Sequence, residues 1–381
     1  MTERELNTLA AIRKCRPPGP RRILSTIHWP RYAERLEGAL LARMAGCTLG
    51  AIVEGWPVER MQAWAARTGD SFPPVDYWSV ADQPDRLRYG VNRHREYTRS
   101  ELETVPVDDD IAYTLLGLLI AERSGPQFTT ADVAAAWLKY LPMACTAEKV
   151  ALENLRRGIP PERAAETDNP YCEWIGAAIR ADPWGYIAPG WPERAAEMAF
   201  RDAFLSHRRN GIFGEMFFAA AIAAAFAVPD PIEAIRIGLT EIPRHCRLAR
   251  EIRWALKCGP RIEDYRDARR AVDERFPRMH HVHTVNNACL IVFGLMIGGT
   301  DVTRVLSETV AMGLDNDCTA ATAGSIVGAI VGRQGVPEHW HRPFNNTVLS
   351  YLKGKRRFTI SGLVRRFTRQ ARRVFTPVSR G

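Results

Sequence analysis

Two segments far apart in the chain carry small residues at every fourth position. The first, 35–55, reads RLEGALLARMAGCTLGAIVEG, and the second, 317–332, reads DCTAATAGSIVGAIVG. A glycine inside a helix costs about 1 kcal/mol relative to alanine, so a stripe of glycines indicates that another element approaches closely. We therefore expect two helices that cross tightly in the core. The small residues are Gly38, Ala42, Gly46 and Gly50 in the first stripe and Ala320, Gly324, Gly328 and Gly332 in the second.

The rest of the central chain also has helical periodicity. Nine more stretches space their apolar residues for a helix, and some begin with a capping signal such as Asp230 before Pro231. No set of alternating β-branched runs and no strand–helix–strand rhythm is present. We therefore expect an all-α fold in one compact domain. The nine stretches are 111–123, 130–140, 146–157, 192–208, 216–227, 231–240, 246–257, 286–297 and 302–312.

The formal net charge of +9 is spread unevenly along the 381 residues. Residues 351–381 carry +10 and residues 1–31 carry +5, which leaves −6 for the body between them. We divide the chain into a basic Pro/Arg-rich N-terminal extension (1–31), a helical domain (32–350) and a basic C-terminal helical tail (351–381). A solvated basic helix accounts for the tail, and contact with nucleic acid through the basic ends stays open as the alternative.

Cysteine usage and hydropathy indicate the compartment. The eight cysteines form no CxxC pair and lack the density of a disulfide scaffold, which is typical of reduced thiols. The first residues lack the apolar stretch of a signal peptide. The longest apolar run, 216–228, has 13 residues, and a membrane span needs about 18 or more. We expect a cytoplasmic protein without a membrane partner.

Two clusters of aspartates precede apolar helical stretches. Asp108, Asp109 and Asp110 stand before the apolar stretch that begins at residue 111. Asp315 and Asp317 stand at the start of the second glycine stripe. One acidic residue suffices to complement a helix dipole, and helix capping is the alternative explanation. Three adjacent carboxylates repel each other and need a counter-charge, which a hard divalent cation with oxygen ligands supplies.

A third acidic feature is Glu54, at the end of the first glycine-striped segment. A carboxylate that follows a tightly packed helix can reach a pocket and act as a general base or as a metal ligand. A solvated glutamate at a helix end is the alternative.

These three features, in this order, resemble the ADP-ribosylglycohydrolase family, which includes the dinitrogenase reductase-activating glycohydrolases. LEGALLARMAGCTLGAIVE at 36–54 is similar to the family's opening EGALLGLAIGDALG…E helix. DDDIAY at 108–113 is similar to its TDDT motif, and GLDNDC at 313–318 to its closing G-x-D-x-D-T motif. Weaker similarity at 176–186, 206–226 and 283–295 extends the resemblance over roughly residues 35–350.

The resemblance implies an all-α fold with a central cleft that holds two Mg²⁺ ions, or Mn²⁺ in their place. It implies hydrolysis of an N- or O-glycosidic bond at C1″ of ADP-ribose or of an ADP-ribosylated substrate. By position in the motifs, the catalytic residues would be Glu54, Asp109 and Asp317. The metal ligands would be Asp108, Asp109, Asp110, Asp315, Asp317 and Cys318. The substrate-binding residues would be Arg180, His207, Asn210 and Asn286.

Four residues depart from the family's motifs. Asp108 and Cys318 each stand where the family has threonine, and sulfur is a poor ligand for Mg²⁺. Cys47 replaces the aspartate of the opening helix, and Ile111 replaces the last threonine of TDDT. The departures leave two alternatives open: an N-ribosyl hydrolase for a smaller nucleotide or nucleoside-type metabolite, and a non-catalytic protein that binds ADP-ribose or a nucleotide.

Two other groups of side chains are candidates with common structural explanations. His280, His281 and His283 could contribute to a zinc site, but no Cys or His lies at finger spacing, which favours a pocket wall or the surface. Aromatic residues could stack on a nucleobase, although a lone aromatic more often packs in the core. These aromatic residues are Trp56, Tyr113, Tyr171, Trp174 and Trp184.

Overall fold

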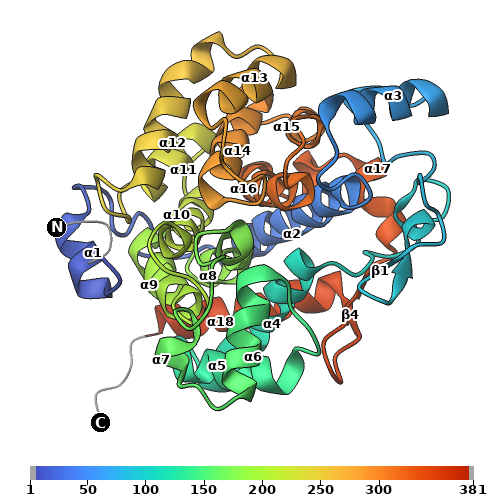
Figure 1. The fold of residues 1–381 in the computed structure, drawn as a ribbon. Helices are drawn as coiled ribbons and strands as arrows, with labels where there is room; N and C mark the ends of the chain where they lie inside the picture. The colour runs from blue at the N-terminus through green and yellow to red at the C-terminus, as the bar shows by residue number, and fades with distance from the viewer. Residues whose placement is uncertain (1–5, 377–381) are drawn as a thin grey trace.

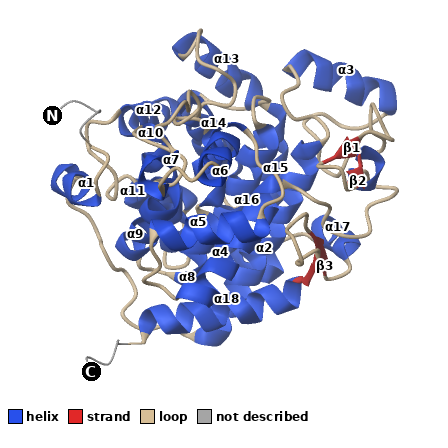
Figure 2. Ribbon diagram, turned by 60° about the horizontal axis from the view of Figure 1, so that its bottom comes forward, coloured by secondary structure: helices blue, strands red, loops and turns tan. Residues whose placement is uncertain are grey.

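The computed structural model describes residues 6–376 and confirms an all-α fold. Within these residues eighteen α-helices pack into one body, and the four strands form two short antiparallel pairs. Figure 1 shows helices α2 and α16 in the middle of the body, with the other helices around them. Figure 2 shows β1, β2 and β3 at one side of it.

Helices α2 (Trp29–Ala51) and α16 (Asn316–Gly335) contain the two glycine stripes and pack against each other. A Cβ placed at Gly46 would lie 2.4 Å from the Ala320 carbonyl oxygen. One placed at Gly328 would lie 2.3 Å from the Gly38 carbonyl oxygen. No real Cβ atom fits at such distances, so only glycine allows the two backbones to touch. The predicted close crossing is confirmed.

The apolar helix α10 (Asn210–Ala225) contacts α16 and several of the outer helices. All of its sixteen residues are buried, as expected for a helix that is apolar on every side. It begins six residues before the predicted 216. The helix before it, α9 (Pro192–Ala203), ends five residues before the predicted 208, and the backbone at Arg209, with a φ of 50°, precedes α10.

The remaining helices surround this core. Seven of the nine other predicted stretches, all but those at α9 and α10, agree with helices of the structure to within a few residues. These are α4 (Asp109–Ser124), α5 (Thr130–Tyr140), α6 (Thr146–Arg156), α11 (Pro231–Gly238), α12 (Arg247–Cys258), α14 (Thr284–Gly298) and α15 (Val302–Ala311). Further helices are α1 (Leu9–Cys15), α3 (Val58–Thr68), α7 (Pro161–Ala164), α8 (Asp182–Ile187), α13 (Tyr265–Arg275) and α17 (Glu338–His341).

The two basic ends lie against the body. In the N-terminal stretch, Arg16 pairs with Glu193 and with Glu241, each at 2.5 Å. Near the C-terminus, α18 (Ile360–Phe375) packs an apolar face on α2, α4 and α8. Its Arg366 pairs with Glu122 at 2.7 Å. Among the described residues, none of the helices combines the length and the hydropathy needed to cross a bilayer.

The strands form two hairpins that the sequence periodicity did not predict. β1 (Leu87–Arg88) pairs with β2 (Asn92–Arg93), with Arg88 opposite Asn92. β3 (Thr347–Leu349) pairs with β4 (Arg357–Thr359). Each strand has only two or three residues, too few for an alternating pattern to stand out.

Candidate active site

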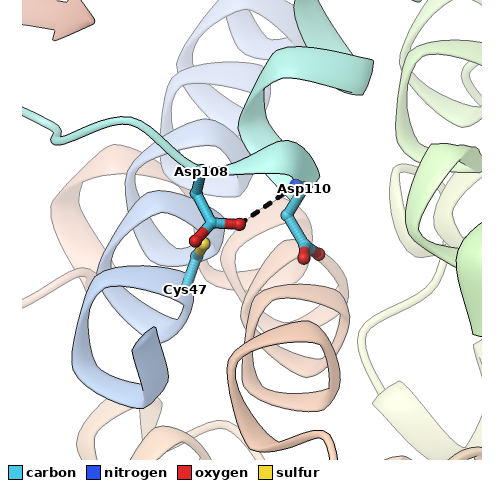
Figure 3. A group of neighbouring side chains, drawn as sticks. All are labelled: Cys47, Asp108 and Asp110. Atoms are coloured by element: carbon cyan, nitrogen blue, oxygen red, sulfur yellow. Dashed lines mark hydrogen bonds between the residues drawn. The ribbon is translucent and has the colours of Figure 1, made fainter. Parts of the chain in front are cut away.

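The first aspartate cluster lies at the start of α4. Asp108 caps this helix, and its Oδ1 accepts a hydrogen bond of 3.1 Å from the Asp110 amide (Figure 3). Asp109 and Asp110 occupy the first turn, where the helix dipole favours negative charge. The buried guanidinium of Arg43, on α2, lies 3.5 Å from the Asp110 carboxylate and 2.7 Å from the Asp182 carboxylate. The predicted capping role and the predicted clustering therefore coexist at one helix end.

The second cluster lies at the start of α16, directly against α2. A Cβ at Gly50 would lie 2.4 Å from Cα of Asp317, so the glycine stripe is what allows Asp317 to sit on α2. The amide of Asp315 donates to Oδ1 of Asn287 at 3.3 Å. Asp110, Asp317 and Cys318 have ligand atoms within 4.8 Å of one another, so the two motifs meet in one centre.

The residue at the heart of this centre is Arg88, which the sequence reasoning missed. Its Nη1 lies 2.7 Å from Glu54 Oε2, and its Nη2 lies 2.6 Å from Asp317 Oδ2. Its Nε and Nη2 both lie 2.8 Å from Asp108 Oδ2. One guanidinium thus joins carboxylates from the end of α2, the start of α4 and the start of α16.

Arg88 reaches the centre from the β1–β2 hairpin. The turn of this hairpin places Tyr89 at a φ of 51° and Gly90 at 69°, the left-handed conformation that tight hairpins use. The Tyr89 hydroxyl donates to Asp109 Oδ1 at 2.7 Å. Two neighbouring hairpin residues therefore hold two neighbouring aspartates.

Burial makes the carboxylates hard to ionise together. It raises the pKa of Asp109 well above its usual value, and the charges of Asp108 and Asp110 add to the effect. Burial and then the charge of Glu54 raise the pKa of Asp315 to about 7 and that of Asp317 well above its usual range. The cluster therefore contains more carboxylates than the nearby positive charge keeps ionised.

The donor atoms of the centre fit a hard divalent cation. Three groups of side chains each bring their ligand atoms within 4.8 Å of one another. Asp315 Oδ1 and Asp317 Oδ1 are buried and have no hydrogen-bond partner, an arrangement that a bound cation would satisfy. The groups are Cys47–Asp108–Asp110 (Figure 3), Asp110–Asp317–Cys318 and Glu54–Asp315–Asp317.

The two thiols contribute little to such a site. Burial raises the pKa values of Cys47 and Cys318 well above the ordinary thiol value, which keeps both neutral. The Cys318 thiol donates to Asp110 Oδ2 at 3.1 Å instead of offering a thiolate. Oxygen atoms therefore make up most of the candidate ligands of the centre.

A cavity of about 360 Å³ opens beside the carboxylates. Glu54, with 42% of its side chain exposed, connects the centre to this cavity. The Arg60 guanidinium lies 3.6 Å from the centroid of the Trp56 ring on the cavity wall. Arg86 lines the same cavity, so Trp56, Arg60 and Arg86 form a basic, aromatic wall, on which Asp82 pairs with Arg60 at 2.9 Å.

A protein family and a solved structure are similar to this chain. The family model for ADP-ribosylglycohydrolase matches residues 28–373. The chain belongs to the ADP-ribosylglycohydrolase family. A solved structure described as an "ADP-ribosylglycohydrolase-related protein complex" aligns with a TM-score of 0.62 and 17% identity, over 90% of this chain and 99% of that one. No curated protein matches the chain in sequence.

Membership in the ADP-ribosylglycohydrolase family supports glycohydrolase activity on ADP-ribose-type substrates. The six predicted metal ligands and the predicted catalytic residues lie around the one centre just described. These assignments rest on the resemblance and the geometry, and their roles in the reaction stay predictions.

The four predicted substrate-binding residues lie elsewhere, in buried networks of their own. Arg180 pairs with Glu148, Asp202 and Glu215 and is 2% exposed. Asn210 donates to Glu173 at 2.9 Å. His207 Nδ1 contacts the Ser206 hydroxyl at 2.8 Å, and Asn286 donates to the His280 carbonyl at 3.0 Å. None of these contacts reaches the carboxylates of the acidic centre, so contact with substrate stays a prediction for all four.

The histidine and aromatic candidates separate in the structure. Trp174, His280 and His281 form a stack with successive ring centroids 4.2 Å apart. Within residues 6–376, the clusters with ion-binding spacing contain no histidine. Trp184 is packed in the core, whereas Trp56 lines the cavity.

Proposed function

We propose that the protein hydrolyses the bond at C1″ of ribose in ADP-ribose or in an ADP-ribosylated substrate, with Mg²⁺ as cofactor. The observation that carries this proposal is the convergence of Glu54 and both aspartate motifs beside a cavity in a chain of this family. A smaller N-ribosyl nucleotide is the alternative substrate, because the cavity of about 360 Å³ does not select between the two.

Asp317 would hold the cation through its oxygen atoms together with Asp110 or Asp315, because it belongs to a group with ion-binding spacing with each of them. When bound, Mg²⁺ lowers the pKa of a coordinated water and offsets negative charge that develops at the reacting centre. The buried oxygens of Asp315 and Asp317 without a partner support this assignment.

Glu54 is proposed as the general base because its carboxylate faces both Arg88 and the cavity. It accepts a proton from the attacking water as the water oxygen bonds to C1″ and the bond to the leaving group breaks. The leaving group takes a proton from solvent. Asp109, oriented by the Tyr89 hydroxyl, would contribute negative charge beside the developing oxocarbenium centre once a bound cation lowers its raised pKa.

The basic, aromatic wall is proposed to bind the rest of the substrate. Guanidinium groups pair well with phosphate oxygens, so Arg60 and Arg86 fit the diphosphate. The Trp56 ring, now covered by Arg60 at 3.6 Å, offers a flat surface for the adenine.

The test measures release of ADP-ribose from ADP-ribosyl-arginine and ADP-ribosyl-serine peptides, with Mg²⁺ and after chelation. We expect Glu54→Gln to lower kcat by about 10²–10³-fold, the usual contribution of a general base. Asp317→Asn should lower kcat/KM at least as much, since it removes a ligand and a charge.

Glu122→Gln is the matched control for this assay, because Glu122 pairs with Arg366 on the outside of the body and should leave turnover unchanged. Undiminished turnover in Asp317→Asn, or in the wild-type protein after chelation, would contradict the proposed mechanism.

A second candidate function is non-catalytic binding of ADP-ribose. The contact between Arg88 and three carboxylates favours it, because a fixed cation already neutralises part of the centre. Calorimetry with ADP-ribose, paired with the turnover assay, distinguishes the two: tight binding with no turnover on any ribosyl substrate would support this candidate.

A further inference from the structure

We infer that the guanidinium of Arg88 occupies a cation position in the acidic centre, and that removing its charge opens a divalent-cation site between Glu54, Asp108 and Asp317. The inference deepens the proposed function and depends on it for the identity of the centre. In this chain the positively charged side chain of Arg88 then takes the place of a second metal ion.

The guanidinium of Arg88 pairs with three carboxylates, of which Glu54 and Asp317 lie in one group with ion-binding spacing and Asp108 in another. Its nitrogens lie 2.7 Å from a Glu54 oxygen, 2.8 Å from an Asp108 oxygen and 2.6 Å from an Asp317 oxygen. Carboxylate oxygens that converge from several directions are also what Mg²⁺ and Mn²⁺ require. A guanidinium and a divalent cation therefore compete for the same oxygen atoms.

The two sides of the centre differ in how their oxygens are satisfied. On one side, Arg88 pairs with one oxygen from each of its three carboxylates. On the other side, Oδ1 of Asp315 and Oδ1 of Asp317 are buried with no hydrogen-bond partner. The centre therefore provides one position for an added cation beside the position that Arg88 fills.

The departure of Asp108 from the family's threonine fits the same arrangement. Asp108 is 2% exposed, and a carboxylate buried so deeply needs a positive partner. Arg88 supplies this partner through both Nε and Nη2. An extra carboxylate and an arginine thus occur together, where either one alone would leave a buried charge uncompensated.

Arg88 is held in place by more than its ion pairs. Its Nη1 also donates to the Ala51 carbonyl at 3.0 Å, and its side chain is only 11% exposed. The next residue, Tyr89, is anchored to Asp109 at 2.7 Å. A cation added in solution must therefore displace an anchored side chain to reach these oxygens, so the wild-type protein keeps this position closed.

The experiment titrates Mn²⁺ into the full-length protein and counts the bound ions by electron paramagnetic resonance of free Mn²⁺. We expect Arg88→Gln to bind one more Mn²⁺ per chain than the wild-type protein. Arg88→Lys keeps the positive charge and should not gain an ion. Arg95→Gln is the matched control: Arg95 is exposed, follows the hairpin in sequence and pairs with Asp85. This variant should bind as many Mn²⁺ ions as the wild type.

Two further variants locate the gained ion. Adding Asp108→Asn to Arg88→Gln should remove the extra ion, since Asp108 would be its ligand. In the wild-type background, Asp108→Asn should leave the Mn²⁺ count unchanged, because Asp108 there pairs with Arg88. This last variant still tests the inference if Arg88→Gln does not fold.

An equal count in Arg88→Gln and wild type, or loss of wild-type Mn²⁺ in Asp108→Asn, would overturn the inference. The outcome is separate from catalysis. If the wild type binds no ion and Arg88→Gln binds one, the role of Arg88 stands while the metal dependence of the proposed function fails.

Discussion

Arg88 and Arg180 each pair with three carboxylates, yet their surroundings differ. Arg180 lies in the 3₁₀ turn Ile175–Arg180 and pairs with Glu148 of α6, Asp202 of α9 and Glu215 of α10. Other donors complete this network: the Trp184 indole bonds Glu215 at 3.0 Å, and Arg180 also bonds the Ser206 hydroxyl at 3.1 Å. The Arg180 cluster is sealed and nearly satisfied within the fold.

The Arg88 cluster is neither sealed nor balanced. It borders a cavity, and it is continuous with Asp109, Asp110 and Asp315, whose pKa values burial raises. Two of its carboxylate oxygens have no partner. Arg88 and Arg180 thus show that the number of ion pairs does not distinguish a structural cluster from a functional one. An opening to a cavity and buried carboxylate oxygens without a partner do separate them, whereas burial raises carboxylate pKa values in both clusters.

The largest expected effect on stability comes from breaking the sealed cluster. Arg180→Met leaves three buried carboxylates without their cation, which should lower the free energy of unfolding by about 3–5 kcal/mol. Urea denaturation measures this change. Adding Mn²⁺ should not restore stability, whereas it should restore the smaller loss in Arg88→Gln. Recovery of Arg180→Met by Mn²⁺ would show that the two clusters are equivalent after all.

A second prediction uses the glycine stripe to disturb one cluster alone. A Cβ at Gly50 would meet the Asp317 backbone at 2.4 Å, and one at Gly328 would meet the Gly38 backbone at 2.3 Å. Both Gly50→Ala and Gly328→Ala should cost about 2 kcal/mol of stability through overpacking. Only Gly50→Ala should also weaken Mn²⁺ binding and turnover, because only it moves an aspartate of the centre. Equal losses of binding in both variants would argue against this.

A third prediction concerns the helix that contacts Asp315. His283 caps α14 by accepting a 3.2 Å hydrogen bond from the Val285 amide, and Asn287 in that helix bonds Asp315. Burial lowers the pKa of His283 to about 4, with the charge of Arg247 adding to the effect. Since the unfolded chain takes up this proton near pH 6.5, stability is full above that pH and falls as the pH drops toward 4.

We expect this loss to be about 2 kcal/mol, because His283 retains some contact with solvent. His283→Asn keeps a capping side chain but has no charge to gain, so its stability should change less between pH 6.5 and 4. Urea denaturation at the two pH values measures the difference. An unchanged pH dependence in His283→Asn would contradict the assignment.

Much of the fold could be predicted because its signals are local. The four-residue period of small side chains in 35–55 and 317–332 reports helical geometry and close packing within one segment, and the α2–α16 crossing confirms it. The acidic motifs could also be recognised in the sequence, because several aspartates stand close together beside apolar stretches. Helices α3 and α13 were missed because only three residues of each are buried, too few to mark a helical period.

The sequence by itself thus determined the helical class, the central crossed pair and the carboxylates that cluster at helix starts. Tertiary structure alone decided what faces them. Arg88 lies in a two-residue strand with no periodic signal, and its partners Asp108, Glu54 and Asp317 are 20, 34 and 229 positions away. Burial, charge pairing and access to a cavity depend on such distant contacts, so periodicity along the chain could not report which arginine completes the centre and which one is sealed in the core.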